Sequence, residues 1–277
     1  MSVTRAVPKY FDFLIEGFGR GEVGRHEHLG HWEAAPDPAA LGAADFGRAQ
    51  ARLDAILLEM FGLADGQRVL DAGCGFGGTL QAVNERHAGM RLLGVNVDPR
   101  QLEICRQIVP RAGNRLDWEL ADACRLPVAD ASFDRVLCIE AMFHFSSRRE
   151  FFREAGRALR PGGALVCSDI VASRAARGLQ AAGFRNEAAL RDGYGPWPDL
   201  WGEDADHGAL AAAAGLRRSV LQDATRETSP SHRYTVPSGI DEGRDPGDPM
   251  LRAALMLRWL HREGHLRVLY MRFDKPA

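Results

Sequence analysis

One short segment of the sequence combines residue types and spacings that suit the binding of a small ligand. Asp71 ends an apolar run and is followed by glycines at positions 73, 75, 77 and 78. Glycines directly after a strand let the backbone turn sharply, and they let a ligand approach where a side chain would block it. The segment is therefore a candidate for a loop that holds a cofactor.

Two interpretations of this glycine loop compete. Gly73, Gly75 and Gly78 satisfy the G-x-G-x-x-G pattern of a dinucleotide site. Asp71 with the glycines at 73, 75 and 77 instead gives the D-x-G-x-G-x-G loop that accepts S-adenosylmethionine. A carboxylate at this place can accept hydrogen bonds near a cationic aminoacyl group, whereas beside a pyrophosphate its charge would repel. The carboxylate favours a ligand that is cationic at that end.

The next expected strand end weakens the dinucleotide interpretation. A dinucleotide site uses an acidic side chain about 20 residues after the loop to hold the ribose hydroxyls. This chain has Asn96 there, with Asp98 beyond it. The expected acid is thus replaced by an amide.

Polar residues also follow three later apolar runs. Asp122 comes after the third run, Glu140 and His144 come after the fourth, and Asp169 lies near the end of the fifth. Open α/β sheets bind ligands at the carboxyl ends of their strands, so these side chains are expected near the glycine loop.

In this order, the features between about residues 67 and 171 resemble class I S-adenosylmethionine-dependent methyltransferases that act on small molecules and natural products, including sarcosine/dimethylglycine N-methyltransferases. Gly94–Gln101 is similar to the G-x-T-x-S-x-x-Q stretch of tocopherol and cyclopropane-fatty-acid methyltransferases. Residues 121–127 are similar to the family's G-D-A-x-x-L-P, with Ala121 in place of the glycine. The E-x-x-x-H pattern at 140–144 resembles macrolide sugar O-methyltransferases.

The resemblance implies S-adenosylmethionine as the cofactor and assigns its contacts. Asn96 and Gln101 would hold the ribose, Asp122 would accept from the adenine amino group, and the backbone N–H of Ala123 would meet the ring. The predicted cofactor-binding residues are Asp71, Gly73, Gly75, Gly77, Asn96, Gln101, Asp122, Ala123, Tyr10 and His28.

The N-terminal part of the chain is expected to close over the cofactor. Residues 28–32 resemble the H-x-G-x-W segment that small-molecule methyltransferases place there, and Tyr10 is a second candidate. Histidines at 26, 28 and 31 could instead bind a metal, but no carboxylate or cysteine partner is evident from the sequence. We predict no metal site.

Three residues are candidates for catalysis. A hydroxyl acceptor must lose a proton, and His144 is the predicted general base because histidine titrates near neutral pH. In macrolide sugar O-methyltransferases a histidine at the matching place has this role. Glu140 could orient His144 or bind a cationic acceptor, and Asp169 could contact the substrate.

Aromatic residues predict an apolar substrate pocket, and the candidates are Phe143, Phe145, Tyr194, Trp197 and Trp201. We expect a small, largely hydrophobic metabolite that is methylated on a hydroxyl or an amine. One alternative is a C-methyltransferase acting on an isoprenoid diphosphate or on another alkene or aromatic carbon. A second alternative is of another class, either a non-catalytic cofactor-binding domain or an NAD-dependent oxidoreductase domain.

The elements that must position these residues alternate between strand and helix. Strands are expected at 67–71, 91–97, 116–120, 135–139, 164–170, 219–224 and 266–273, and helices at 46–61, 79–87, 99–109, 148–159, 207–216 and 250–261. This alternation implies right-handed crossovers and helices on both faces of a parallel sheet. The predicted fold is α/β: a Rossmann-like, doubly wound, seven-stranded, mostly parallel sheet with one antiparallel edge strand.

Four segments are expected along the chain. Residues 1–45 should form an N-terminal lid or helical cover, and 46–171 the cofactor-binding core. Residues 172–200 should form a substrate cap inserted after the fifth strand, and 201–277 the rest of the core sheet.

Composition limits the possible partners. The 277 residues include 35 basic and 37 acidic side chains, a formal charge of −2, so no global field attracts nucleic acid or an anionic membrane. Five scattered cysteines form no C-x-x-C pair, and no apolar run approaches the ~20 residues that span a bilayer. We expect a cytoplasmic bacterial protein, monomeric or homodimeric, that binds a small molecule and neither nucleic acid nor membrane.

Overall fold

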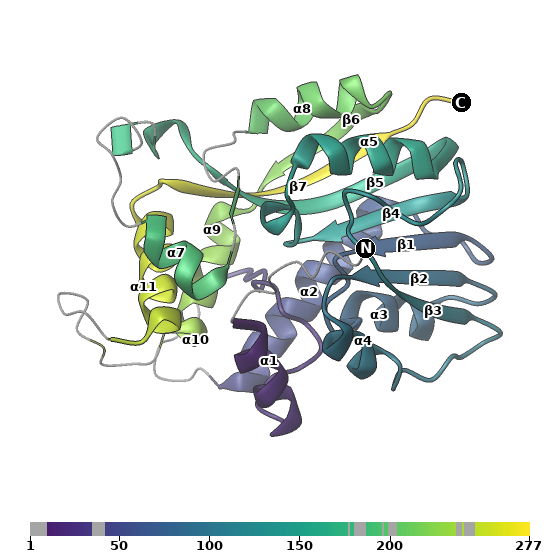
Figure 1. The fold of residues 1–277 in the computed structure, drawn as a ribbon. Coiled ribbons are helices and arrows are strands. Elements are labelled where there is room, and N and C mark those ends of the chain that lie inside the picture. The colour runs from purple at the N-terminus through teal and green to yellow at the C-terminus, as the bar shows by residue number, and fades with distance from the viewer. Residues whose placement is uncertain are drawn as a thin grey trace, which may run out of the picture.

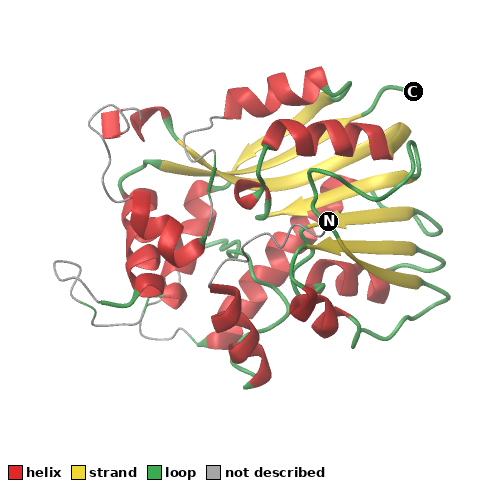
Figure 2. Ribbon diagram, viewed as in Figure 1, coloured by secondary structure: helices red, strands yellow, loops and turns green. Residues whose placement is uncertain are grey.

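The computed structural model of the chain describes residues 10–34, 42–176, 178–179, 187–195, 197–198, 204–236, 240 and 247–277. In this part of the chain seven strands form one sheet, and helices cover both of its faces (Figure 1, Figure 2). The strands are β1 (Arg68–Ala72), β2 (Arg91–Asn96), β3 (Arg115–Leu120), β4 (Phe133–Ile139), β5 (Leu159–Ala172), β6 (Arg217–Asp223) and β7 (Leu266–Asp274).

The strand order is β3-β2-β1-β4-β5-β7-β6. Strands β1 to β5 pair in parallel, whereas β7 runs antiparallel to both β5 and β6. The order reverses at β1, which is the switch point of a doubly wound sheet. The predicted seven-stranded, mostly parallel fold is confirmed, with the antiparallel strand lying just inside the edge strand β6.

The longer helices are α1 (Tyr10–Gly19), α2 (Ala43–Phe61), α3 (Gly78–Arg86), α4 (Pro99–Cys105), α5 (Arg148–Ala158), α7 (Glu187–Tyr194), α8 (Asp204–Ala213) and α11 (Pro249–Arg262). Helix α2 ends at Gly62, which has φ +57° and donates its N–H to the carbonyl of Glu59, as the sequence predicts.

Adjacent residues of the buried strands pack on opposite faces of the sheet. Val69 of β1 joins a core with Leu53 and Leu57 of α2, whereas Leu70 joins a second core with Phe151 and Phe152 of α5. Strands buried on both faces carry continuous apolar runs, which is why these segments are recognisable in the sequence.

Three boundaries differ from expectation. Strand β5 begins at Leu159 rather than at 164, and its pairing with β4 shifts from Phe133 opposite Leu159 to Arg135 opposite Ala164. Helix α4 ends at Cys105, four residues early, in a region followed by Pro110, which disfavours helix before it. Residues 225–235, expected to be almost wholly loop, form three short helical turns: α9 (Thr225–Thr228), η3 (Ser229–Ser231) and α10 (His232–Thr235).

Helices also gather beyond the carboxyl ends of the parallel strands (Figure 1). Helix α1 lies there and is tied to α4 because Arg100 pairs with both Asp12 and Asp98. Helix α7, from the predicted cap, packs closely on α11, since a Cβ added to Gly193 would lie 2.3 Å from the Cβ of Ala253. These helices could enclose a ligand at this edge of the sheet.

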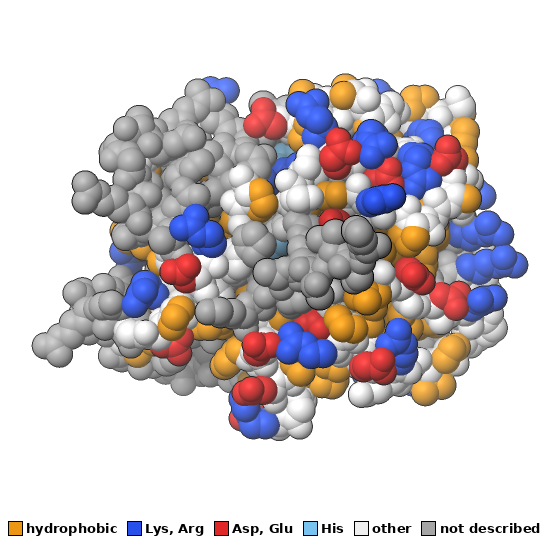
Figure 3. Space-filling model, viewed as in Figure 1, with side chains coloured by type: hydrophobic (Ala, Val, Ile, Leu, Met, Phe, Trp, Pro, Cys, Tyr) orange, Lys and Arg blue, Asp and Glu red, His pale blue; other side chains and the backbone are white. Residues whose placement is uncertain are grey.

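On the face seen in Figure 3, basic and acidic side chains are interspersed over the described surface. Within the described residues, the helices are all too short or too polar to cross a membrane.

Candidate functional site

A cavity lies at the carboxyl ends of β1, β2 and β4, next to α1 and residues 25–32, which we call the strap. Of the thirteen predicted site residues, ten line it: Tyr10, His28, Asp71, Gly73, Gly75, Asn96, Gln101, Ala123, Glu140 and His144. Gly77, Asp122 and Asp169 are not part of its lining.

The glycine loop needs its glycines for different reasons. Gly73 and Gly75 have φ of +83° and +51°, which L side chains rarely adopt. A Cβ on Gly73 would lie 2.5 Å from the Cβ of Ala141, and one on Gly75 would lie 2.6 Å from a carboxylate oxygen of Glu27. Gly77 also has a positive φ, but its missing Cβ makes room for Trp118. Gly77 therefore serves packing beneath the loop rather than the cavity surface.

Two amides and a carboxylate form a chain of hydrogen bonds at the end of β2. Asn96 accepts from the N–H of Val97 at 2.8 Å and donates to the side-chain carbonyl of Gln101. Gln101 in turn donates its Nε2 hydrogen to Oε1 of Glu27 at 3.3 Å. The structure thus brings the two predicted ribose contacts together, with each orienting the next.

Glu27 is a cavity residue that the sequence analysis missed. The strap that carries it is held in place because Gln50 of α2 donates to the carbonyls of His26 and His28, at 2.9 and 2.8 Å. Arg25 donates to the carbonyl of Phe76 at 3.0 Å, next to the glycine loop. The sequence did carry a signal for Glu27, because this residue lies between His26 and His28.

Burial raises the pKa of three carboxyl groups of the cavity. Burial and the charge of Asp98 raise the pKa of Glu27 to about 8. Burial and the charge of Asp54 raise the pKa of Asp71 to about 7, and burial also raises the pKa of Glu140. A cationic ligand would favour the ionised form of these groups.

Of the two residues predicted to contact adenine, Ala123 lines the cavity and Asp122 does not. Asp122 accepts from the N–H of Cys124 at 2.9 Å and shapes the turn after β3. Ala123 is buried and lines the cavity.

Glu140 is held in an unusual backbone conformation, with φ of +45°. Such a conformation costs of the order of 1 kcal/mol or more for a residue with a side chain. One carboxylate oxygen, Oε2, accepts from the N–H of Leu29 in the strap at 3.0 Å. The other, Oε1, is buried and has no partner among the described residues. A strained backbone and an unpaired oxygen at the cavity point to a binding role.

His144 and Tyr10 meet across the cavity. The phenol oxygen of Tyr10 lies 2.9 Å from Nε2 of His144. Burial and the charge of Glu27 hold the pKa of Tyr10 well above its usual range, so the phenol stays protonated. When the proton of a neutral His144 is on Nδ1, the phenol donates to Nε2, which is then the acceptor.

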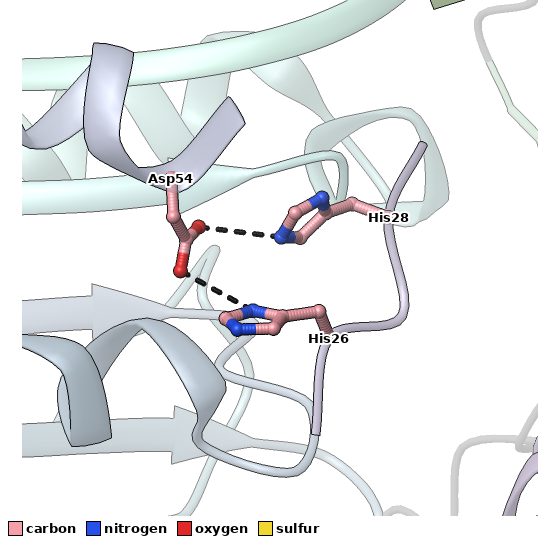
Figure 4. A group of neighbouring side chains, drawn as sticks. All are labelled: His26, His28 and Asp54. Carbon is pink, nitrogen blue, oxygen red and sulfur yellow. Dashed lines mark ion pairs between the residues drawn. The ribbon is translucent and has the colours of Figure 1, made fainter. Parts of the chain in front are cut away.

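The strap is fastened to α2 by a cluster of His26, His28 and Asp54 (Figure 4). Nδ1 of His26 and Nε2 of His28 each lie 3.2 Å from a different oxygen of Asp54. Their ligand-type atoms fall within 4.8 Å of one another, a set that a metal could use. The carboxylate partner was not visible in the sequence. Because the contacts of both histidines with Asp54 account for the arrangement, the absence of a metal stays our prediction.

We expect the pair of His28 and Asp54 to stabilise the protein less as the pH rises. Burial alone would lower the pKa of His28, but its contact with Asp54 raises it from 6.5 to about 9. A folded-state pKa above the unfolded one gives stability that is complete below pH 6.5 and lost as the pH passes 9. The difference in unfolding free energy between wild type and His28→Asn, measured in urea, should shrink over this range.

A matched control is His87→Asn, whose partner Asp65 is exposed and which lies outside the cavity. The gap between wild type and this control should change much less with pH. If the His28→Asn gap stays constant from pH 6 to 9, the ion pair is not the stabilising contact.

Asp169 is not among the residues that line the cavity, and its contact with the substrate stays a prediction. Its carboxylate accepts from Nε of Arg148 at 2.7 Å, lies 2.8 Å from Nε2 of His207, and accepts from the N–H of Ile170 at 3.0 Å. Burial pushes its pKa upward, but Arg148 and His207 outweigh burial and leave the pKa lowered. These contacts join β5 to α5 and α8.

Aromatic side chains gather beside the His144 end of the cavity. Phe143 stacks on Trp197 with ring centroids 4.6 Å apart, and Tyr10 lies 5.1 Å from the ring of Tyr194. Phe145 lines the cavity itself. Trp201, the remaining aromatic candidate, lies outside the described residues.

Comparison with known proteins gives three findings. A family model described as a methyltransferase domain matches residues 70–167. Methyltransferase GfsG of Streptomyces halstedii is 34% identical over 240 residues, which cover 85% of this chain and 81% of that protein. The 27-O-demethylrifamycin SV methyltransferase of Amycolatopsis mediterranei is 33% identical over 160 residues, covering 57% of this chain and 56% of its own.

Among solved structures, geranyl diphosphate C-methyltransferase from Streptomyces coelicolor has a similar fold, with a TM-score of 0.71 at 18% identity. The match covers 98% of this chain and 100% of that chain. At this identity the likeness concerns the fold alone.

Proposed function

Because this chain belongs to the class I S-adenosylmethionine-dependent methyltransferases of natural-product type, we propose that it methylates a hydroxyl group of a small, largely hydrophobic metabolite. S-adenosylmethionine is the cofactor. Membership of the family removes the oxidoreductase and non-catalytic alternatives that the sequence analysis had left open.

The cavity fits this cofactor. A sulfonium and an ammonium give the cofactor a positive charge at its methionine end, and Asp71 and Glu140 line the cavity with raised pKa values. The glycine loop leaves backbone surface at the same place, since Gly73 and Gly75 have no side chains to block it. Asp71, the glycine loop, Asn96, Gln101 and Ala123 would hold the cofactor.

The hydrogen bond between Tyr10 and His144 is the observation that carries the proposal of an oxygen acceptor. The bound cofactor supplies a methyl group that a nucleophile displaces in line from sulfur. A hydroxyl is a weak nucleophile until a base takes its proton, and we assign that role to Nε2 of His144, a residue that lines the cavity. Tyr10 holds that nitrogen in place until an acceptor hydroxyl takes over its hydrogen bond.

The surroundings of His144 support an apolar acceptor. Phe143 lies next to His144, Phe145 lines the cavity and Tyr194 lies next to Tyr10. Aromatic faces bind apolar rings and chains in a site that excludes water. We propose that residues 172–200 cap this pocket together with α11, on which α7 packs. The relative from Amycolatopsis mediterranei bears an O-methyltransferase name, which agrees with an oxygen acceptor.

Glu140 favours a second candidate, transfer to carbon. Methylation of an alkene passes through a carbocation, which a buried carboxylate and aromatic faces can stabilise. The unpaired Oε1 of Glu140 is available for this, and the same carboxylate could bind an amine acceptor. The similar fold from Streptomyces coelicolor is that of a C-methyltransferase. A cytoplasmic, bacterial, monomeric or homodimeric protein remains our expectation.

A labelling experiment tests the proposed function. The purified protein is incubated with S-adenosylmethionine carrying a trideuterated methyl group and with hydrophobic natural products in matched pairs, with and without a free hydroxyl. We expect label on oxygen in the members that carry the hydroxyl. An isoprenoid diphosphate and an amine series are run beside them, and label found only on their carbon or nitrogen would overturn an oxygen acceptor.

A further inference from the structure

The end of β2 has no free acidic group for the ribose. Asn96 stands where a carboxylate would hold the ribose hydroxyls, and its amide already serves Val97 and Gln101. Asp98, the nearest acid along the chain, is fully buried, accepts from the N–H of Arg100 at 2.9 Å and pairs with the Arg100 guanidinium. Its carboxylate caps α4 and is not part of the cavity lining.

The chain of amides leads instead to Glu27. Asn96 donates to Gln101 and Gln101 donates to Glu27, so each group points its hydrogen towards the carboxylate. Once ionised, the carboxylate of Glu27 has about four acceptor sites and no donor, and among the described residues Gln101 is the donor that the structure gives to it. The remaining sites suit a ligand that brings hydroxyl donors.

The position of this carboxylate fits the ribose rather than the methionine end of the cofactor. Oε2 of Glu27 lies against Gly75, and Oε1 faces Gln101 at the start of α4. Asp71, the acid assigned to the cationic aminoacyl end, lies on β1 and is influenced by Asp54 of α2. Asp71 thus lies on β1, whereas Glu27 lies near the start of the helix that follows β2.

We propose that Glu27, delivered by the strap, binds the ribose hydroxyls of S-adenosylmethionine in place of the acid that the end of β2 lacks. Two vicinal hydroxyls would donate to the carboxylate and supply the donors that it lacks. The inference depends on the cofactor and not on which atom of the acceptor is methylated. It also explains why several hydrogen bonds hold the strap in place. A carboxylate on a loose segment would lose the benefit of preorganisation.

Binding calorimetry without an acceptor tests the proposal. The dissociation constant of S-adenosylhomocysteine is measured for wild type and Glu27→Gln, together with that of an analogue lacking both ribose hydroxyls. Loss of a hydrogen bond to a charged group should weaken S-adenosylhomocysteine binding about 10- to 100-fold in Glu27→Gln. The dihydroxyl-free analogue should bind both proteins within about twofold, since the interacting groups are absent from the ligand.

The controls separate this role from others. Glu33→Gln changes an exposed carboxylate just beyond the strap, which pairs with Arg52 and lies outside the cavity, and it should bind both ligands as wild type does. An analogue without the amino group should still be weakened by Glu27→Gln. If the loss disappears with that analogue, Glu27 binds the ammonium and the proposal is wrong. Equal loss for all ligands, or no loss for any, would also overturn it.

Discussion

Replacing His144 with alanine is expected to lower kcat about 10²- to 10⁴-fold and to leave the dissociation constant of S-adenosylhomocysteine unchanged. The reason is that the imidazole takes the proton of the acceptor hydroxyl, whereas the cofactor is held by the glycine loop and the ends of β2 and β3. Stopped assays with the labelled cofactor give kcat, and calorimetry gives the dissociation constant.

Three further measurements distinguish a base from a residue that only supports the pocket. Added imidazole should restore part of the activity of His144→Ala, since it can occupy the space left and accept the proton. Tyr10→Phe keeps the imidazole but removes its 2.9 Å partner, so its loss should be smaller, about tenfold or less. His87→Ala, a histidine outside the cavity, should keep full activity.

Unchanged turnover in His144→Ala would remove this residue from the mechanism. Glu140→Gln then becomes the informative variant, because transfer to carbon would depend on the unpaired carboxylate oxygen rather than on a base. A large loss in Glu140→Gln combined with full activity in His144→Ala would favour the carbon acceptor.

The glycine loop and the order of the strands were predictable because they rest on local rules. A glycine after an apolar run has to turn, and parallel strands must deliver their ends to one edge, so Asp71, Asn96 and Glu140 come together whatever the details of packing. Glu27 could not be placed in this way. Its position depends on Gln50 of α2 and on Arg25, long-range contacts that no local pattern encodes.

Asp169 shows why the face of a buried strand is hard to assign. Cys167 and Val171 belong to the core under α5, whereas Val166 and Ile170 belong to the core under α2. Both sets are apolar, so the sequence alone does not reveal which face an odd-numbered polar residue takes. The three short turns at 225–235 were missed for a related reason, since four-residue helices are too short to show a periodic pattern.

The structural role of Asp169 leads to a large expected loss of stability. Asp169→Ala would remove the carboxylate that pairs at 2.7 Å with Arg148, a residue only 4% exposed. Removing one partner of a buried ion pair costs about 3–5 kcal/mol, whereas an exposed pair contributes about 0–1 kcal/mol. We therefore expect the free energy of unfolding in urea to fall by about 3–5 kcal/mol. Asp130→Ala is the matched control, because its carboxylate is 77% exposed and pairs with Arg157 at 2.7 Å.

The binding of S-adenosylhomocysteine should separate this structural role from a catalytic one. Folded Asp169→Ala should bind it as wild type does, since the carboxylate faces α5 and α8 rather than the cavity. If the alanine variant does not fold, Asp169→Asn is used, because the amide oxygen can still accept from the N–H of Ile170. A variant of full stability that has lost its turnover would mean that Asp169 acts on the substrate after all, and that the ion pair with Arg148 contributes little to the fold.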